Sequence, residues 1–307
     1  MKVFRKGNSQ REFRQSFKSQ SAMEYLMTYG WAILIIAVVL AALFELGVFN
    51  PMTFAPKASP GSCQVVRPEG AGTTNFISLE GECNGELPQY VAQFNGQSSK
   101  ITVPISTSID LVPSLTITTY AYIKPVPRAA WLFREGISNN YANFGMFVYY
   151  NSTIKEYTLA LECPDKDVLP SNTVVNLNTW NFLALEITSA ANIKLIVNGK
   201  PYPVSSSCTF STNPSYGVEL GGYNPSTNNE YLNGSQSDIQ LYNTSLSANE
   251  IQALYQEGIG GAPIDLQNLV GWWPLNGNAN DYSGNGNNGV PTSITYTSNW
   301  YSGYSAP

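Results

Sequence analysis

A run of 20 residues without a charged side chain, from Tyr25 to Phe44, constrains the fold of this chain more than any other feature. At about 1.5 Å per residue, a helix of this length spans roughly 30 Å, the thickness of one hydrocarbon core. A secretory signal peptide usually has an apolar region of only about 7–15 residues, followed by an A-x-A-like site. No such triplet occurs between Ala32 and Phe49. The sequence therefore predicts a membrane-crossing helix rather than a removed signal or a buried core helix.

The distribution of charge predicts the orientation of this helix. Residues 1–19 hold six basic residues against one acid, a net charge of +5; since the whole chain carries −5, residues 20–307 carry −10. Lys and Arg remain on the cytoplasmic side of a membrane, which places the rest of the chain outside, at the cell surface. The acidic balance argues against nucleic-acid binding. His is absent, which excludes imidazole-based catalysis and His-ligated zinc.

The stretch KSQSAMEYL (residues 18–26) resembles the class III signal of archaeal type IV pilin-like proteins. The resemblance implies that a prepilin-type leader peptidase cuts after Ser19, although Gly is commoner there. Gln20 would then be the first mature residue and Glu24 the fifth. An unpaired carboxylate deep at the edge of a membrane run costs about 2–3 kcal/mol. In a filament of pilin-like subunits the free α-amine of a neighbouring Gln20 would pair with Glu24; the alternative is a Glu without a partner in the headgroup region.

Four cysteines follow the helix, all on the predicted outer side: Cys63, Cys83, Cys163 and Cys208. An even number in an oxidising space favours two disulfides over buried free thiols. Of the three possible connectivities we favour Cys63–Cys83 and Cys163–Cys208, because each pair flanks a local β excursion. No C-x-x-C occurs, so neither a zinc ribbon nor a redox motif is supported.

The outer region has the composition of a β protein. Charged residues make up only 12% of the chain, whereas Asn, Ser, Thr and Tyr are abundant. β-Branched and aromatic runs, separated by turn residues, predict strands at 115–123, 144–150, 180–187 and 193–199. Many short strands are typical of a sandwich or jelly roll. One helix is expected after the capping box of residues 247–250, ending at Gly258.

Ordered pieces of this region resemble the concanavalin A-like, laminin G-type jelly roll. The resemblance covers roughly Gln89 to Tyr255 and is carried by residues 90–104, 115–125, 178–187, 193–202, 218–224 and 231–255. It implies a mainly β fold. The chain then divides into a basic leader, a membrane or pilin-like helix, a stalk with a small disulfide-linked excursion, and the jelly roll, at residues 1–19, 20–49, 50–88 and 89–307.

Residues 269–289 resemble the opening of such a domain, although they lie near the carboxyl terminus. We therefore expect a circularly permuted jelly roll in which residues 268–307 complete the sheet, since domain termini often lie close together. The alternative is a truncated second repeat, but a segment of about 40 residues could not bury a core of its own.

Two motif matches are rejected and one metal remains an expectation. Residues 284–289 match G-x-G-x-x-G, but no βαβ unit surrounds them, which excludes a dinucleotide site. The loop that begins at Asp281 resembles half of an EF-hand, but Thr292 stands where a bidentate Glu is needed. A looser calcium site is expected from the oxygen ligands of Asp281, Asn285 and Asp238, weighed against a turn without metal.

The sequence argues against catalysis. Related jelly rolls include glycosidases that carry E-x-D-x-x-E or E-x-D-x-E on one strand, and neither pattern occurs here. Glu186 and Glu219 each stand on a strand without an acidic partner two residues away. We therefore predict a protein that is not an enzyme.

Aromatic side chains are candidates for stacking on sugars; for any single ring, packing in the core or on the sheet surface is the alternative. Neighbours on a strand face opposite ways, so one residue of each pair, Tyr149–Tyr150 and Trp272–Trp273, should point outward. Loop-like contexts hold Tyr141, Tyr223 and Trp300, whereas Trp131 and Trp180 are assigned to the core.

Three sequons lie on the outer side, at Asn151, Asn233 and Asn243. We expect glycosylation of at least one of them; the alternative is chance occurrence in an Asn-rich chain. The sequence as a whole predicts a membrane-anchored or pilin-like surface adhesin whose jelly-roll head binds a glycan or another surface ligand. A membrane-anchored glycoside hydrolase and a purely structural filament subunit are the alternatives.

Overall fold

The computed structural model describes residues 9–45, 55–104, 106, 109, 114–136, 143–164, 166–210, 217–223 and 230–307. They belong to two compact units, Met1–Ala55 and Pro56–Pro307, and each is described by itself. Tyr141, expected in a loop, lies outside the described residues.

The first unit is a single helix, α1 (Ser9–Glu45). Its part from Met27 to Glu45 is long and apolar enough to cross a membrane, and none of its residues is buried by the protein. The helix begins earlier than the sequence predicted, because it takes in the leader residues and the expected cleavage position after Ser19. The unit is therefore an apolar amino-terminal helix, a feature that membrane anchors and signal sequences share.

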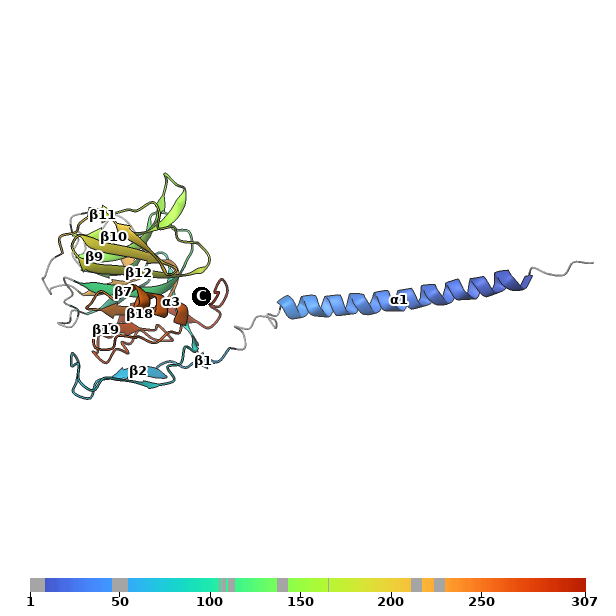
Figure 1. The fold of residues 1–307 in the computed structure, drawn as a ribbon, viewed down its shortest axis with the longest axis horizontal. Helices are drawn as coiled ribbons and strands as arrows, with labels where there is room; N and C mark the ends of the chain where they lie inside the picture. Colours follow the sequence, from blue (N-terminus) through green and yellow to red (C-terminus); the bar gives the residue numbers. More distant parts are fainter. Residues whose placement is uncertain are drawn as a thin grey trace, which may run out of the picture. The chain divides into compact units, whose positions relative to one another are not determined.

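The second unit is a β-sandwich (Figure 1). Among the described residues, one sheet has seven strands, in the order β11 (Lys166–Val168), β10 (Glu156–Cys163), β9 (Phe144–Asn151), β8 (Ala129–Glu135), β15 (Val218–Leu220), β6 (Lys100–Val103) and β20 (Val290–Thr292). The other sheet has eight strands. Seven of them follow the order β14 (Lys200–Val204), β13 (Asn192–Val197), β12 (Trp180–Ser189), β7 (Leu115–Ile123), β18 (Asn233–Tyr242), β5 (Val91–Asn95) and β21 (Thr295–Thr297). The eighth, β19 (Leu269–Trp273), pairs with the second half of β18, whereas β5 pairs with the first half. The predicted mainly β jelly roll is confirmed.

The core between the sheets is built by alternation along the strands. On β7, Leu115, Ile117, Ala121 and Ile123 face inward and pack with the inward residues of β8, β9 and β10. The four predicted strands coincide with β7, β9, β12 and β13 to within two residues at each end. Local patterning thus placed the strands correctly.

A third layer covers the outer face of the eight-stranded sheet (Figure 1). It consists of α3 (Ala248–Glu257), the hairpin of β2 (Cys63–Val66) and β3 (Ser78–Gly81), and the short pair β1 (Lys57–Ala58) and β4 (Leu87–Pro88). As predicted, α3 begins with a capping box at Ser247 and ends at Gly258. Its buried residues Ile251 and Leu254 pack on this face.

The carboxyl-terminal segment contributes strands to both sheets. β19 pairs with β18, β20 with β6, and β21 with β5. Trp273 of β19 is completely buried between the sheets. The segment therefore completes the sandwich, as expected; that it is permuted relative to other jelly rolls stays a prediction.

The third layer corrects the expectation for the paired tryptophans. Trp273 faces the core, and Trp272 faces the opposite side, but Trp272 is only 4% exposed. Its ring lies in the apolar cluster formed with α3 and the β2–β3 hairpin. The alternation was right and the exposure was wrong, because another layer covers that face. Trp180 is buried in the same cluster rather than between the sheets.

Both disulfides join the cysteines that the sequence paired. Cys63 is bonded to Cys83 across the β2–β3 hairpin, and Cys163 to Cys208 at a separation of 45 residues. The first disulfide links two segments within the third layer, whereas the second links the end of β10 to the segment after β14.

Candidate functional site

Charged side chains lie on the outer face of the seven-stranded sheet, in a row across its strands. Glu162 of β10 and Arg134 of β8 flank Gly145 of β9, and Glu219 of β15 lies next to Arg134. All three charged residues are at most 5% exposed. Burying an ion pair is expensive and gives little stability. A buried charged row on an outer sheet face is therefore a candidate for function.

Arg134 is the centre of this row. Its Nε lies 3.4 Å from an oxygen of Glu162, and its guanidinium also donates to the carbonyl of Gly136. The guanidinium carbon lies 3.7 Å from the ring centroid of Tyr223 and 5.8 Å from that of Trp131, which are cation–π distances. The Arg134 side chain is therefore fixed by an acid on one side and by aromatic rings on the other.

A short hairpin lies over the row. It is formed by β16 (Gly222–Tyr223) and β17 (Glu230–Tyr231), and both strands contact β8. Tyr223 packs edge-on against Trp131 at 6.0 Å, and Glu230 accepts a hydrogen bond of 2.9 Å from the Trp131 indole. The hairpin thus explains why Trp131, although on an outer face, is only 3% exposed.

An aromatic stripe continues from Trp131 along β9. Phe147 lies directly opposite Trp131, and Tyr149, two residues on, shares the same face. Tyr149 is half-buried and has small neighbours, Ala129 and Thr158, on the adjacent strands. We call this surface the charged aromatic patch; it comprises Trp131, Arg134, Phe147, Tyr149, Glu162, Asp167, Glu219, Tyr223 and Glu230.

The electrostatics of the patch are acidic. Burial and the nearby charge of Glu230 raise the pKa of Asp167. Burial also raises the pKa of Tyr223, with Arg134 acting against it and the surrounding carboxylates adding to it. Glu219 is paired with Lys100 at 2.5 Å. The patch therefore combines partly exposed tyrosine rings with fixed acceptors, which suits a ligand rich in hydroxyl groups.

The two buried acids of the row are poorly placed for glycoside hydrolysis. Glu162 and Glu219 are three strand spacings apart, roughly 14 Å between Cα atoms at about 4.8 Å per spacing. Moreover, Arg134 stands between them and each acid has a basic partner. The row is thus held as ion pairs rather than as an acid and a nucleophile.

The predicted calcium ligands do not fit a calcium ion. Asp281 accepts from the backbone amides of Trp272, Ser283 and Asn287 and from the Ser283 hydroxyl, so each of its oxygens already has two protein donors. The Asn285 side-chain oxygen accepts from the Gly72 amide. Among the described residues, no group of three or more acidic, Cys or His side chains could hold a metal ion.

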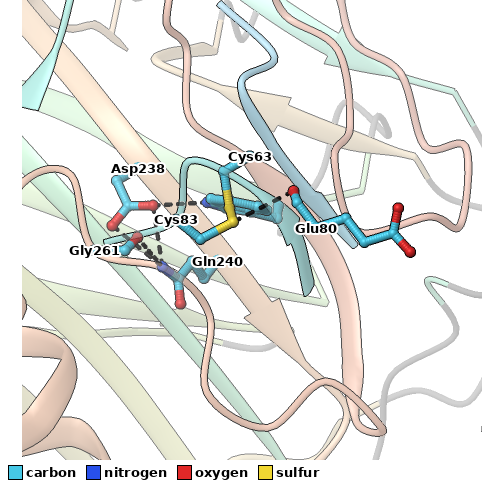
Figure 2. Close-up of a disulfide and its surroundings, with 7 residues drawn as sticks. Cys63, Glu80, Cys83, Asp238, Gln240 and Gly261 are labelled. Atoms are coloured by element: carbon cyan, nitrogen blue, oxygen red, sulfur yellow. Dashed lines mark hydrogen bonds between the residues drawn. A yellow bond between two sulfur atoms is a disulfide. The ribbon is translucent and has the colours of Figure 1, made fainter. Parts of the chain in front are cut away.

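Asp238, the third expected ligand, has a different role. It lies on the outer face of the eight-stranded sheet, near the Cys63–Cys83 disulfide (Figure 2), and accepts hydrogen bonds from Gln240 and from the Trp272 indole. Burial raises its pKa to about 7. A cavity of about 50 Å³, lined by Asp238 and both cysteines, adjoins it. At about 10–15 Å³ per water, a volume of this size holds a few waters.

The guanidinium of Arg67 lies beside the turn that Asp281 begins. Arg67, on the third layer, donates to the carbonyls of Ser283, Leu266 and Leu269, and also to that of Thr73. Asp281 interacts with it favourably, whereas burial lowers the pKa of Arg67. The side chain is 9% exposed. The protein itself therefore supplies a positive charge to this loop.

The three sequons differ in accessibility. Asn151 donates to the Tyr149 hydroxyl and Asn233 to the Pro125 carbonyl, whereas the Asn243 side chain is exposed. Glycosylation of at least one of them stays a prediction. Ser19, Gln20 and Glu24 lie within α1, in the part where only the backbone is described.

Sequence reasoning singled out Trp131, Tyr149, Glu219 and Tyr223 separately but missed the patch they form, together with Arg134. One signal was available: WLFRE (131–135) and LALEC (159–163) each place a charge inside an apolar strand. A charge in such a position needs a partner, but its partner comes from another strand and cannot be identified locally.

Comparisons with known proteins agree with this fold. A family model described as the concanavalin A-like lectin/glucanases superfamily matches residues 95–252, just over half of the chain. A comparison with curated proteins finds no similar sequence.

Solved structures are similar at low identity. A Bacteroides ovatus protein described as a candidate carbohydrate-binding protein has a TM-score of 0.52 and 15% identity over 72% of this chain and 63% of that one, so this chain spans less than two thirds of that protein. A SAP-like pentraxin of Limulus polyphemus has a TM-score of 0.46 and 15% identity over 67% and 94% of the two chains. Domain 4 of a Geobacillus stearothermophilus GH43 arabinanase, in complex with arabinotriose, has a TM-score of 0.42 and 15% identity over 66% of this chain and 86% of that one.

Proposed function

Since the chain belongs to the concanavalin A-like lectin/glucanases superfamily, we propose that its β domain is a glycan-binding module that the apolar helix α1 holds at the cell surface. The observation that carries the proposal is the charged aromatic patch. Tyr149 and Tyr223 present partly exposed rings, and the half-buried Glu230 carboxylate lies between the Tyr223 hairpin and Trp131. Rings that stack on sugar faces, next to groups that accept from hydroxyls, are what an uncharged glycan needs.

The shared fold supports the proposal in a limited way. The Bacteroides ovatus protein is described as binding carbohydrate, and at 15% identity its similarity to this chain is one of fold alone. The ligand of this chain is thus proposed from its own residues. The acidic character of the patch favours neutral over acidic sugars, because Glu162, Asp167, Glu219 and Glu230 outnumber Arg134 and Lys100 there.

A glycan array tests the proposal, with full-length protein in a detergent that has no sugar headgroup. We expect binding to neutral oligosaccharides. Tyr149→Ala and Tyr223→Ala should each weaken it by tenfold or more, which corresponds to about 1.4 kcal/mol. Tyr150→Ala is the matched control, since Tyr150 is on the same strand, is 44% exposed and lies against Tyr157 instead. Equal loss in all three variants would contradict a site at the patch.

For α1 we propose membrane insertion and pilin-like processing. The uncharged run after a basic leader supports insertion, and the KSQSAMEYL stretch supports cleavage by a prepilin-type peptidase before Gln20. Mass spectrometry of the native protein should then find Gln20 as the first residue. An intact leader would reduce the proposal to a plain membrane anchor, and a start after Phe44 would remove the anchor as well. Assembly with other pilin-like subunits rests on the first result.

Glycoside hydrolysis is a second candidate, and one observation favours it. Burial, and then the charge of Glu230, raise the pKa of Asp167, and carboxyl groups with raised pKa values occur in glycosidase sites. Glu230, however, is bound to the Trp131 indole. We therefore propose that the protein is not an enzyme. Release of reducing ends from a bound oligosaccharide, abolished in Asp167→Asn, would establish the opposite.

A further inference from the structure

A groove of about 170 Å³ lies on the other side of the sandwich, on the outer face of the eight-stranded sheet. Its floor is a row across three strands, with Tyr122 of β7 opposite Ser235 of β18, and Ser235 opposite Gln93 of β5. One wall contains Trp180 and Trp300. Here the third layer leaves the sheet partly uncovered.

The Tyr122 ring is fixed in this groove. It packs edge-on against Trp180 at 6.0 Å, and the backbone of Gly303 also lies against it, so close that a Cβ there would be 3.0 Å from the ring. Trp180 is held in turn by the bond from its indole to the Trp300 carbonyl. The ring is half-buried, so part of it remains open to a ligand.

Polar groups without protein partners surround the ring. The Lys124 ammonium lies two residues beyond Tyr122 and makes no ion pair or hydrogen bond within the described structure. The Ser235 hydroxyl makes no hydrogen bond there either. The Gln93 side-chain oxygen accepts from the Thr295 hydroxyl, whereas the Gln93 amide NH2 group donates to no protein group within the described structure. Among the described residues that line the groove, Lys124 carries a charge and the others are neutral.

We propose that this groove is a second saccharide site, and that it binds a carboxylated sugar such as a hexuronic acid. The aromatic ring supplies a stacking surface, Ser235 and Gln93 supply hydrogen bonds to hydroxyls, and Lys124 pairs with the carboxylate. The charged aromatic patch on the opposite sheet carries the reverse charge. The two faces would thus sort acidic from neutral sugars of one glycan, or hold two glycans at once. This site is independent of the patch and does not rest on it.

Isothermal titration of the full-length protein with trigalacturonate tests the site, with galactotriose as the uncharged counterpart. We expect trigalacturonate to bind and its affinity to fall at least tenfold in Lys124→Gln. Arg128→Gln is the control, because it removes another exposed positive charge, one that lies outside the groove. Tyr149→Ala and Tyr223→Ala should leave trigalacturonate binding unchanged.

Three results would overturn the inference: no binding of trigalacturonate by the wild type, equal binding by Lys124→Gln, or equal loss in Arg128→Gln. Each leaves the proposed function standing provided that neutral glycans still bind at the patch. Loss of trigalacturonate binding in the Tyr149 and Tyr223 variants alone would move the acidic sugar to the patch, which also contradicts a second site. Gln93→Ala, an exposed substitution, serves as the second variant and should weaken trigalacturonate binding by several-fold.

Discussion

The two outer faces of the sandwich have different uses. The outer face of the eight-stranded sheet is mostly covered by an apolar layer, in which α3, the β2–β3 hairpin and the carboxyl-terminal segment bury Trp180, Trp272 and Trp300. The outer face of the seven-stranded sheet carries the charged aromatic patch under a short hairpin. Apolar burial of the first kind stabilises a fold, whereas buried ion pairs of the second kind contribute little stability.

The two faces also differ in the partners that their buried charged side chains have. On the covered face, Arg67 and Asp281 are satisfied almost wholly by backbone groups of the protein. On the patch, Arg134 and Glu162 are matched to each other and to rings. We therefore expect substitutions inside the apolar layer to change stability, and substitutions on the patch, or in the groove that this layer leaves uncovered, to change binding.

The largest effect should come from truncation after Gly261. This deletion removes β19, β20 and β21 together with Trp273, and it exposes the edge of β18. The loss should exceed the whole stability of the domain, which is typically about 5–15 kcal/mol. Circular dichroism and gel filtration of the truncated protein should show a molten or aggregated head. A truncated head with an unchanged melting temperature would mean that the segment is a dispensable second repeat.

Next in size are the neighbouring tryptophans. Trp272→Ala and Trp273→Ala should each lower the free energy of unfolding by about 3–5 kcal/mol, because both rings are buried, one in each layer. Urea denaturation measures this, with Tyr150→Ala as an exposed control that should cost about 0.5 kcal/mol or less. A mild Trp272 variant would show that the third layer is not packed on the sheet, and the comparison between the two faces would then fail.

A pH dependence should follow from Asp238. Its folded-state pKa of about 7 lies above its ordinary value of 3.8, so the folded protein holds the proton more tightly than the unfolded chain. Its contribution is therefore fully present below about pH 4 and is lost as the pH rises to about 7, by at most roughly 4 kcal/mol. Burial raises the pKa of Asp281 in the same direction.

Urea unfolding between pH 4 and pH 8 measures this slope. Asp238→Asn should flatten most of it, since Asn does not titrate and tolerates the positive φ of 49° at this position. An unchanged slope in the variant would assign the pH dependence to other groups.

A smaller effect is expected at Arg67. Arg67→Met keeps an unbranched apolar stem but leaves the carbonyl partners of Arg67 without donors, which should cost about 2–3 kcal/mol. Arg67→Lys should recover only part of the loss, because an ammonium cannot reach the same set of carbonyls. Thermal unfolding of the three proteins gives the comparison, and a neutral Arg67→Met would contradict the role assigned to this guanidinium.

The smallest effect concerns calcium. Since the Asp281 turn is filled by protein donors and has Arg67 beside it, neither EDTA nor millimolar calcium should move the melting temperature of the wild type. A rise of several degrees with calcium would restore the metal site that the loop sequence predicts.

Much of this molecule follows from its sequence alone. The uncharged run predicts the apolar helix, the alternation of residues predicts strands such as β7 and β12, and the residues at 247–250 predict α3 with its cap. These are local patterns, because a period or a cap is complete within a dozen residues. The jelly-roll fold could be identified because many such pieces occur in a characteristic order.

Only the tertiary structure decides what covers each face. Alternation predicted that one of Trp272 and Trp273 faces outward, but residues 56–90, which bury Trp272, lie about 200 positions away. The charged aromatic patch likewise joins Arg134, Glu162 and Glu219 from three strands. The period of a strand fixes the direction of a side chain and says nothing of its neighbours, because those are set by sheet order and by the layers packed against the sheet.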